Sequence, residues 1–191
     1  MAQHVYLVRH GETALNADGR LRGLADPELN DVGEHQARAV AAALAEIDAD
    51  VVVSSPLRRA VRTAAAIAHH AGTTHRVDDR FNDRDYGQWT GEVKSEVIAE
   101  WGSVDAAPGV EPMETVLSRS APALDEWGAW AESRHKAVVV VTHDAVIRPL
   151  LMHIAPDLPT PSVPTASYQV LRYEVGVWSV ELTDQQAPPI D

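Results

Sequence analysis

Three short apolar runs, rich in valine, constrain the fold of this chain more than any other feature. They are Val5–Val8, Val51–Val53 and Val138–Val141, and polar residues follow each of them. Continuous β-branched runs of this length are typical of strands buried on both faces of a parallel sheet. Helical patterns separate the runs, and strands that alternate with helices indicate an α/β fold. We therefore expect a three-layer α/β/α sandwich with a mainly parallel central sheet.

The expected helices cover residues 31–47 behind an Asn30 cap, 57–71 behind Pro56, 113–133, and 145–154. Pro122 should kink the third helix or split it in two, and Pro149 should distort the fourth. Near the end of the chain, residues 168–173 and 177–182 predict a hairpin that turns at Gly176.

Length and composition narrow the class of protein. A chain of 191 residues suits a single domain, expected here over residues 1–183 with a flexible tail over 184–191. The absence of cysteine excludes disulfides, thiolate zinc sites and a thiol nucleophile. No charged leader or membrane-length apolar segment is present, so we expect a cytoplasmic protein. The net charge of −12 disfavours nucleic acid and anionic membranes as partners. Oligomeric state stays open between monomer and homodimer.

Cationic groups follow all three apolar runs, where strands of a parallel sheet would end. The segments are Arg9-His10-Gly11, Ser54–Arg59 and Thr142-His143-Asp144. Ligands of open α/β sheets bind outside the carboxyl ends of the strands, so these groups should converge on one rim. A compact dianion such as a phosphoryl group fits that set of charges.

Arg9 and His10 suit phosphoryl chemistry in different ways. A guanidinium forks onto phosphoryl oxygens, and a neutral imidazole is a competent nucleophile at physiological pH. Gly11, next in the chain, is expected to let a ligand approach the backbone. A buried strand that merely ends in two polar residues would explain these residues alone, but not the two matching strand ends.

In these strand-end residues and the segments around them, the chain resembles the histidine phosphatase superfamily, in its phosphoglycerate mutase-like branch. The matching blocks are Leu7–Thr13 with Asn16, Leu29–Gly33 with Gln36 and Ala37, Ser54–Arg59 with Thr63 and Ala64, Asp83–Gly91, and Val141–Asp144. Five blocks in the same order are far more specific than any one motif. The resemblance implies a phosphoglycerate mutase-like fold and an enzyme that needs neither metal nor cofactor.

The resemblance also implies roles for individual residues. His10 would be the nucleophile that forms a phosphohistidine, while Arg9, Arg58 and His143 would bind the phosphoryl oxygens. Asn16 would add a neutral hydrogen bond. Fixed donors of this kind provide most of the catalysis in phosphoryl transfer.

The general acid is expected to be Asp83, four residues before Gly87, where the family often has glutamate. Aspartate is one methylene shorter, and Asp85 is a nearby competitor at a position that matches a non-catalytic one in the family. We favour Asp83 on geometry.

Other polar residues are given structural roles. Asp144, where many relatives have glycine, is expected to cap the following helix. The side chains of Arg22, Arg59 and Arg62 are expected to be solvated near the pocket mouth. His69, His70 and His75 lack the spacing of a metal site and fit a solvated helix end.

The expected activity is hydrolysis of a small phosphorylated metabolite. An isomerase that transfers the phosphoryl group, as phosphoglycerate mutases do, is the main alternative, and an inactive phosphate-binding module is another. A mutase needs cations for the substrate carboxylate and a lid against water. The corresponding segment, Glu92–Glu111, is short and acidic, with Lys94 as its only basic residue, which favours the phosphatase.

Overall fold

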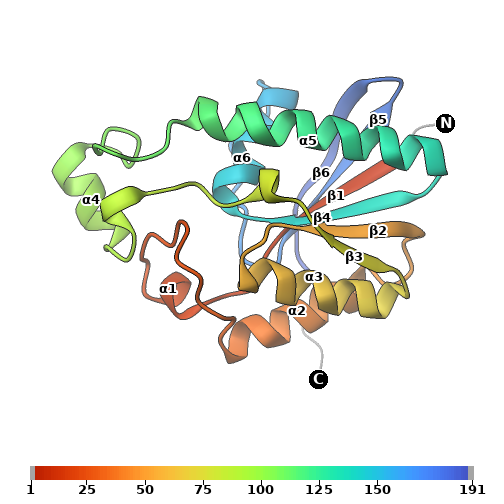
Figure 1. Ribbon diagram of the computed structural model, residues 1–191, viewed down its shortest axis with the longest axis horizontal. Helices are drawn as coiled ribbons and strands as arrows, with labels where there is room; N and C mark the ends of the chain where they lie inside the picture. Colours follow the sequence, from red (N-terminus) through yellow and green to blue (C-terminus); the bar gives the residue numbers. More distant parts are fainter. Residues whose placement is uncertain (1–2, 189–191) are drawn as a thin grey trace.

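The computed structural model describes residues 3–188 as a six-stranded sheet with helices on both faces (Figure 1). The strands are β1 (Gln3–Arg9), β2 (Ala49–Ser54), β3 (Thr74–Val77), β4 (Ala137–Thr142), β5 (Tyr168–Glu174) and β6 (Val177–Gln185), in the order β3-β2-β4-β1-β5-β6. β1, β2, β3 and β4 pair in parallel, whereas β5 and β6 are antiparallel to their neighbours. The predicted α/β fold with a mainly parallel sheet is confirmed.

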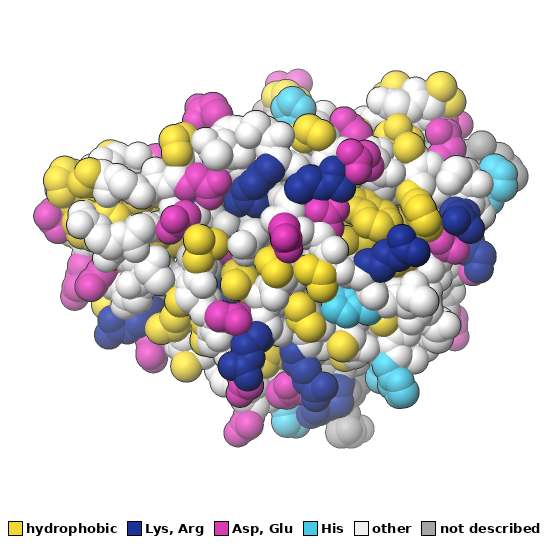
Figure 2. All heavy atoms as spheres, in the orientation of Figure 1, with side chains coloured by type: hydrophobic (Ala, Val, Ile, Leu, Met, Phe, Trp, Pro, Cys, Tyr) yellow, Lys and Arg dark blue, Asp and Glu magenta, His cyan; other side chains and the backbone are white. Residues whose placement is uncertain are grey.

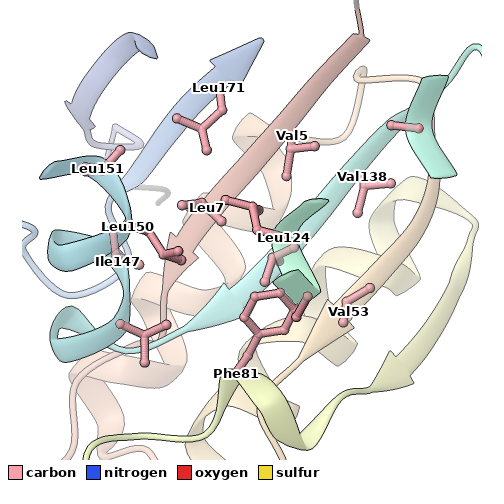
Figure 3. Close-up of a cluster of buried hydrophobic side chains, with 14 of the residues drawn as sticks. Val5, Leu7, Val53, Phe81, Leu124, Val138, Ile147, Leu150, Leu151 and Leu171 are labelled. Atoms are coloured by element: carbon pink, nitrogen blue, oxygen red, sulfur yellow. The ribbon is translucent and has the colours of Figure 1, made fainter. Parts of the chain in front are cut away.

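The two faces of the sheet bury separate hydrophobic clusters, because successive strand residues point to opposite sides. On one face, α5 (Met113–Arg134) and α6 (Asp144–Ile154) cover a cluster that includes Leu7, Phe81 and Leu124 (Figure 3). On the other, α2 (Asp31–Ala43) and α3 (Arg58–Ala71) cover a cluster that includes Val8 and Val52. The three valine-rich runs lie in both clusters, as buried strands must.

A set of short elements lies beyond the sheet. They are the helices α1 (Ala14–Ala17) and α4 (Lys94–Trp101) and the 3₁₀ turns η1 (Asp79–Phe81) and η2 (Gly87–Trp89). Figure 1 places α1 and α4 together at one end of the molecule. A third cluster, built on Leu21, Tyr86, Val97 and Ala107, packs α4 against the loop that follows α1 and the segment around η2. Sequence patterns did not reveal these elements, nor the edge strand β3.

Two expectations about the second half of the chain need correction. Pro122 does not split α5, which is one helix from Met113 to Arg134 with one face packed against the sheet. The predicted tail begins too early, since β6 continues through Gln185. Asp184 is fixed there because its N–H donates to the Gln169 side chain and its carboxylate accepts from Val163 N–H. Residues 189–191 of that tail lie outside the described residues. No helix among residues 3–188 is long and apolar enough to cross a membrane.

Candidate active site

The carboxyl ends of three neighbouring strands meet at one edge of the sheet. Arg9, the last residue of β1, is opposite Thr142, the last residue of β4, and β4 lies between β1 and β2. His10 and His143 come directly after β1 and β4, and their ring centroids are 5.1 Å apart. The two imidazoles therefore lie together, as the sequence predicted.

His10 is held as a neutral imidazole with a defined lone pair. Its Nδ1 lies 2.6 Å from the Gly11 carbonyl oxygen, which can only accept, so Nδ1 carries the proton. The Arg59 Nε donates to the other nitrogen, Nε2, over 3.3 Å. Burial lowers the pKa of His10 well below its ordinary value, and the charge of Arg59 lowers it further. The lone pair on Nε2 is what a nucleophilic imidazole requires.

Arg59 is completely buried and links the surrounding segments. Its guanidinium donates to the Asp83 carboxylate over 2.8 Å and to the Gly23 and Ala25 carbonyl oxygens over 2.9 and 2.7 Å. The prediction of a solvated Arg59 is wrong. Helical spacing in the sequence indicates that Arg59 is buried, because Thr63 lies one turn further along on the same buried face of α3.

Arg58, the arginine expected to bind phosphate, lies outside this cluster. Its side chain is 59% exposed and forms an ion pair with Glu28. Adjacent residues of a helix point about 100° apart, so the start of α3 can direct only one of the two arginines inward. That residue is Arg59. Arg62, one turn beyond Arg58, is exposed as expected and pairs with Glu34.

Asp83 lies in the cluster, whereas its competitor does not. The Asp83 side chain is 3% exposed, and its Oδ2 is 2.8 Å from Arg59 and 3.4 Å from the Nδ1 of His143. Asp85 is exposed and accepts a hydrogen bond from the Gly87 N–H. The geometry thus places Asp83, and not Asp85, beside His143 and Arg59.

The segment that carries Asp83 is fixed from α5. The Arg119 guanidinium donates to the carbonyl oxygens of Arg80, Asn82 and Asp83 over 2.7–2.9 Å. These carbonyl groups lie in and just after the short turn η1, and Arg119 supplies hydrogen-bond donors to them.

His143 and Arg9 complete the cluster. The His143 Nε2 lies 2.7 Å from the Ser55 hydroxyl, and burial lowers the pKa of His143, followed by the charges of Arg59 and Arg22. Arg9 donates to the Val163 carbonyl oxygen over 2.6 Å, and burial lowers the pKa of Arg9 to about 10, so it stays charged at neutral pH.

Asn16 has a different position. Its side-chain oxygen accepts from the N–H and the hydroxyl of Thr13 and caps α1. Within residues 3–188 no hydrogen bond joins Asn16 to His10 or His143. Because the side-chain oxygen of Asn16 is already used in this cap, only its amide N–H groups could donate a hydrogen bond to a bound anion.

Three buried side-chain nitrogen atoms have no hydrogen-bond partner among the described residues: Nε of Arg9, Nε of Arg22 and Nδ1 of His143. The last lies near Asp83 but without hydrogen-bond geometry. Buried polar atoms are almost always satisfied, so these three are candidates for contact with a bound ligand, and the two guanidinium nitrogens can donate to an anion. On the face drawn in Figure 2, acidic and basic side chains are interspersed, and the net charge is −12. The arginines gathered at the candidate site, Arg9 and Arg59, lie inside the protein instead of on this face.

Gly11 has a packing function in addition to the predicted one. A Cβ on Gly11 would lie 2.5 Å from the Gly33 carbonyl oxygen, and a Cβ on Gly33 would lie 2.0 Å from the Glu12 carbonyl oxygen. The two glycines allow the chain after β1 to pack backbone to backbone against the start of α2. That contact by itself requires a glycine at position 11.

The remaining polar residues have structural partners. Asp144 does not cap α6, as was expected, but pairs with Arg148 one turn on, over 2.6 Å. His69 and His70 lie in the last turn of α3, and the His75 Nε2 lies 2.8 Å from the Ser54 hydroxyl. Across residues 3–188 no group of three or more potential ligands could hold a metal ion.

Comparisons with known proteins identify the family to which the chain belongs. The family model of the histidine phosphatase superfamily (branch 1) matches residues 5–186. A glucosyl-3-phosphoglycerate phosphatase of Mycolicibacterium vanbaalenii is 34% identical over 78% of this chain and 72% of its own length. An uncharacterized phosphatase, PhoE, of Bacillus subtilis is 31% identical over 93% of this chain and 92% of its own.

A solved structure extends the likeness to three dimensions. The mycobacterial glucosyl-3-phosphoglycerate phosphatase in complex with VO3 has a TM-score of 0.82 and 27% identity, over 96% of this chain and all of that one. The family match spans nearly all of the described residues, including every member of the buried cluster. The chain therefore belongs to the histidine phosphatase superfamily (branch 1).

Proposed function

We propose that this phosphatase hydrolyses small phosphomonoesters through a phosphohistidine on His10. The observation that carries the proposal is the neutral imidazole of His10, whose Nε2 accepts a long hydrogen bond from Arg59 and whose ring lies 5.1 Å from that of His143. The phosphoryl group would lie beside that Nε2. Its negative charge would favour the protonated form of His143, against the effect of burial.

In the first half-reaction, the His10 Nε2 attacks phosphorus and the bond to the leaving oxygen breaks. Asp83, in its protonated form, gives its proton to that oxygen, so that an alcohol departs. Arg9, Arg59 and His143 stabilise the charge on the three remaining phosphoryl oxygens, which is the main requirement of this transition state. Arg59 thus takes the phosphoryl-binding role predicted for Arg58, and Asn16 adds an amide donor.

In the second half-reaction, the Asp83 carboxylate takes a proton from water while the water oxygen attacks phosphorus. The bond between phosphorus and Nε2 breaks, phosphate leaves, and His10 returns to its neutral form. No step requires a metal ion, because guanidinium groups supply the positive charge.

The role of Asp83 is tested by replacing it with asparagine. Asp83→Asn should lower turnover by ~10²-fold or more on alkyl phosphates, whose alkoxide leaving groups need a proton. Turnover of p-nitrophenyl phosphate should fall far less, because nitrophenolate leaves without one. The matched variant Asp85→Asn should change neither rate appreciably. An equal loss on both esters would make Asp83 structural, and a larger effect at Asp85 would reverse the assignment.

Net hydrolysis, and not isomerisation, is the expected outcome. The segment Glu92–Glu111 carries a single lysine, and Asp105 and Glu111 within it bind arginines of the protein itself. The segment therefore has few free polar side chains that could retain the released alcohol. Water should therefore reach the phosphohistidine before a second alcohol does.

A phosphate-release screen over phosphorylated metabolites tests this conclusion, with 3-phosphoglycerate included and its isomer measured in parallel. Relatives are a glucosyl-3-phosphoglycerate phosphatase and a phosphoserine phosphatase, so phosphorylated hydroxy acids belong on the panel. We expect phosphate release from several esters with little isomerisation. Rapid isomerisation without release would identify a mutase instead. We further propose a cytoplasmic enzyme that works as a monomer or homodimer.

A further inference from the structure

The connection between α6 and β5 lies against the last residue of β1. The Arg9 guanidinium donates to the Val163 carbonyl oxygen over 2.6 Å, and this is the single hydrogen bond of that side chain in the described part of the protein. The backbone N–H of Arg9 donates to the Ser167 carbonyl oxygen over 2.9 Å. The direction of the Arg9 guanidinium therefore depends on where the Val163 carbonyl group points.

Val163 has a backbone conformation that valine rarely adopts. Its φ is +46°, in the left-handed region, where the Cβ of an L-residue comes too close to its own backbone. The side chain is completely buried in the cluster under α5 and α6. A conformation of this kind persists only where the surrounding structure imposes it, and such residues are concentrated at functional sites.

The groups that impose this conformation come from the end of β6. The Asp184 carboxylate accepts hydrogen bonds from the N–H groups of Ser162 and Val163 over 2.8 and 2.9 Å, and from the Ser162 hydroxyl over 3.0 Å. The Asp184 N–H donates to the buried side chain of Gln169 over 2.6 Å. Burial opposes ionisation of Asp184, but the hydrogen bonds from Ser162 and Val163 outweigh it and lower its pKa. The charged carboxylate thus fixes the two peptide groups that precede the Val163 carbonyl.

We propose that Asp184 is a positioning residue for Arg9: it holds Val163 in the left-handed conformation, and the Val163 carbonyl oxygen then directs the Arg9 guanidinium toward the phosphoryl group. The inference rests on the proposed hydrolysis at His10. Arg9 would bind phosphoryl oxygens, which all the substrates share. Asp184 therefore influences the part that is common to every ester, and not the alcohol portion.

The first test removes the charge of Asp184. Asp184→Asn should lower kcat/KM by ~10-fold, and by a similar factor on p-nitrophenyl phosphate and on an alkyl phosphate, because both present the same phosphoryl group to Arg9. The Kd for inorganic phosphate, measured by calorimetry, should rise by ~5-fold or more. A merely structural role would reduce the amount of active enzyme and leave KM and Kd unchanged. Glu181→Gln is the matched control, because it removes a carboxylate that pairs with His4 at the surface of the same strand, and it should behave like the wild type.

The second test uses glycine, which adopts the left-handed conformation without a clash. With Val163→Gly added to Asp184→Asn, the carbonyl group can keep its direction without the carboxylate. The combined variant should recover at least ~3-fold of the lost kcat/KM. Val163→Ala in the same background should recover none, because alanine keeps the Cβ. Both changes remove most of the buried side chain, so the difference between them reports on the backbone.

Several results would overturn the inference. They are unchanged kcat/KM and phosphate affinity in Asp184→Asn, equal recovery with glycine and with alanine, and a loss confined to alkyl phosphates, which would connect Asp184 with the leaving group. If Asp184→Asn does not fold, Asp184→Glu keeps the charge but moves the carboxylate by one methylene, and it must still weaken phosphate binding, or the inference fails. Failure of the proposed function looks different, because the wild type would then release phosphate from no ester, p-nitrophenyl phosphate included.

Discussion

His10→Ala is expected to remove at least ~10³-fold of the phosphatase activity, because a nucleophile and the groups around it act as a unit. The loss should appear in kcat on every ester, since the variant cannot form the covalent intermediate. Steady-state phosphate release from p-nitrophenyl phosphate and from an alkyl phosphate measures it.

A folding control is needed because His10 is fully buried. The circular dichroism spectrum should be unchanged, and the variant should still bind inorganic phosphate through Arg9 and Arg59. Turnover within ~10-fold of the wild type in a folded variant would show that His10 is not the nucleophile.

The second large effect distinguishes two adjacent arginines. Arg59→Met should lower kcat by ~10²–10³-fold, the usual loss when a fixed donor to the transition state is removed. Arg58→Met should change it by less than ~3-fold, because its exposed ion pair with Glu28 contributes little. The two variants make the same change of side chain and charge at adjacent positions. The ratio of their kcat values therefore tests which arginine acts on the transition state.

Arg59 also holds Asp83 and two backbone carbonyls, so Arg59→Met will unfold at a lower temperature. Arg59→Lys keeps the charge and should be more stable, yet it should remain strongly impaired because the fork is lost. A larger kcat effect at Arg58 than at Arg59 would show that Arg58 binds the phosphoryl group, as the sequence predicts.

Much of the fold followed from local sequence patterns. Runs such as Val138–Val141 are buried on both faces, and only a parallel sheet covered on both sides provides that environment. Because parallel strands end at one edge, the meeting of His10 and His143 could be predicted as well. Short surface elements such as α4 depend on contacts with a distant loop, and their sequences carry little periodic signal.

The choice between Arg58 and Arg59 shows why site details were harder. The two differ only in their spacing from the buried residues further along α3, since Arg59 shares its face with Thr63 and Arg58 does not. The position of Asp83 was beyond local reasoning, since Arg119, 36 residues later, fixes the carbonyl groups of its loop.

The central claim, a covalent phosphohistidine on His10, is tested most directly by trapping the intermediate. The enzyme is mixed with an ester labelled in the phosphoryl group, quenched within one turnover and digested, and the labelled peptide is sequenced by mass spectrometry. The account predicts an acid-labile, base-stable label on His10, absent from His10→Ala and more abundant at steady state in Asp83→Asn with p-nitrophenyl phosphate. Label on any other residue, or full turnover without a labelled enzyme, would contradict it.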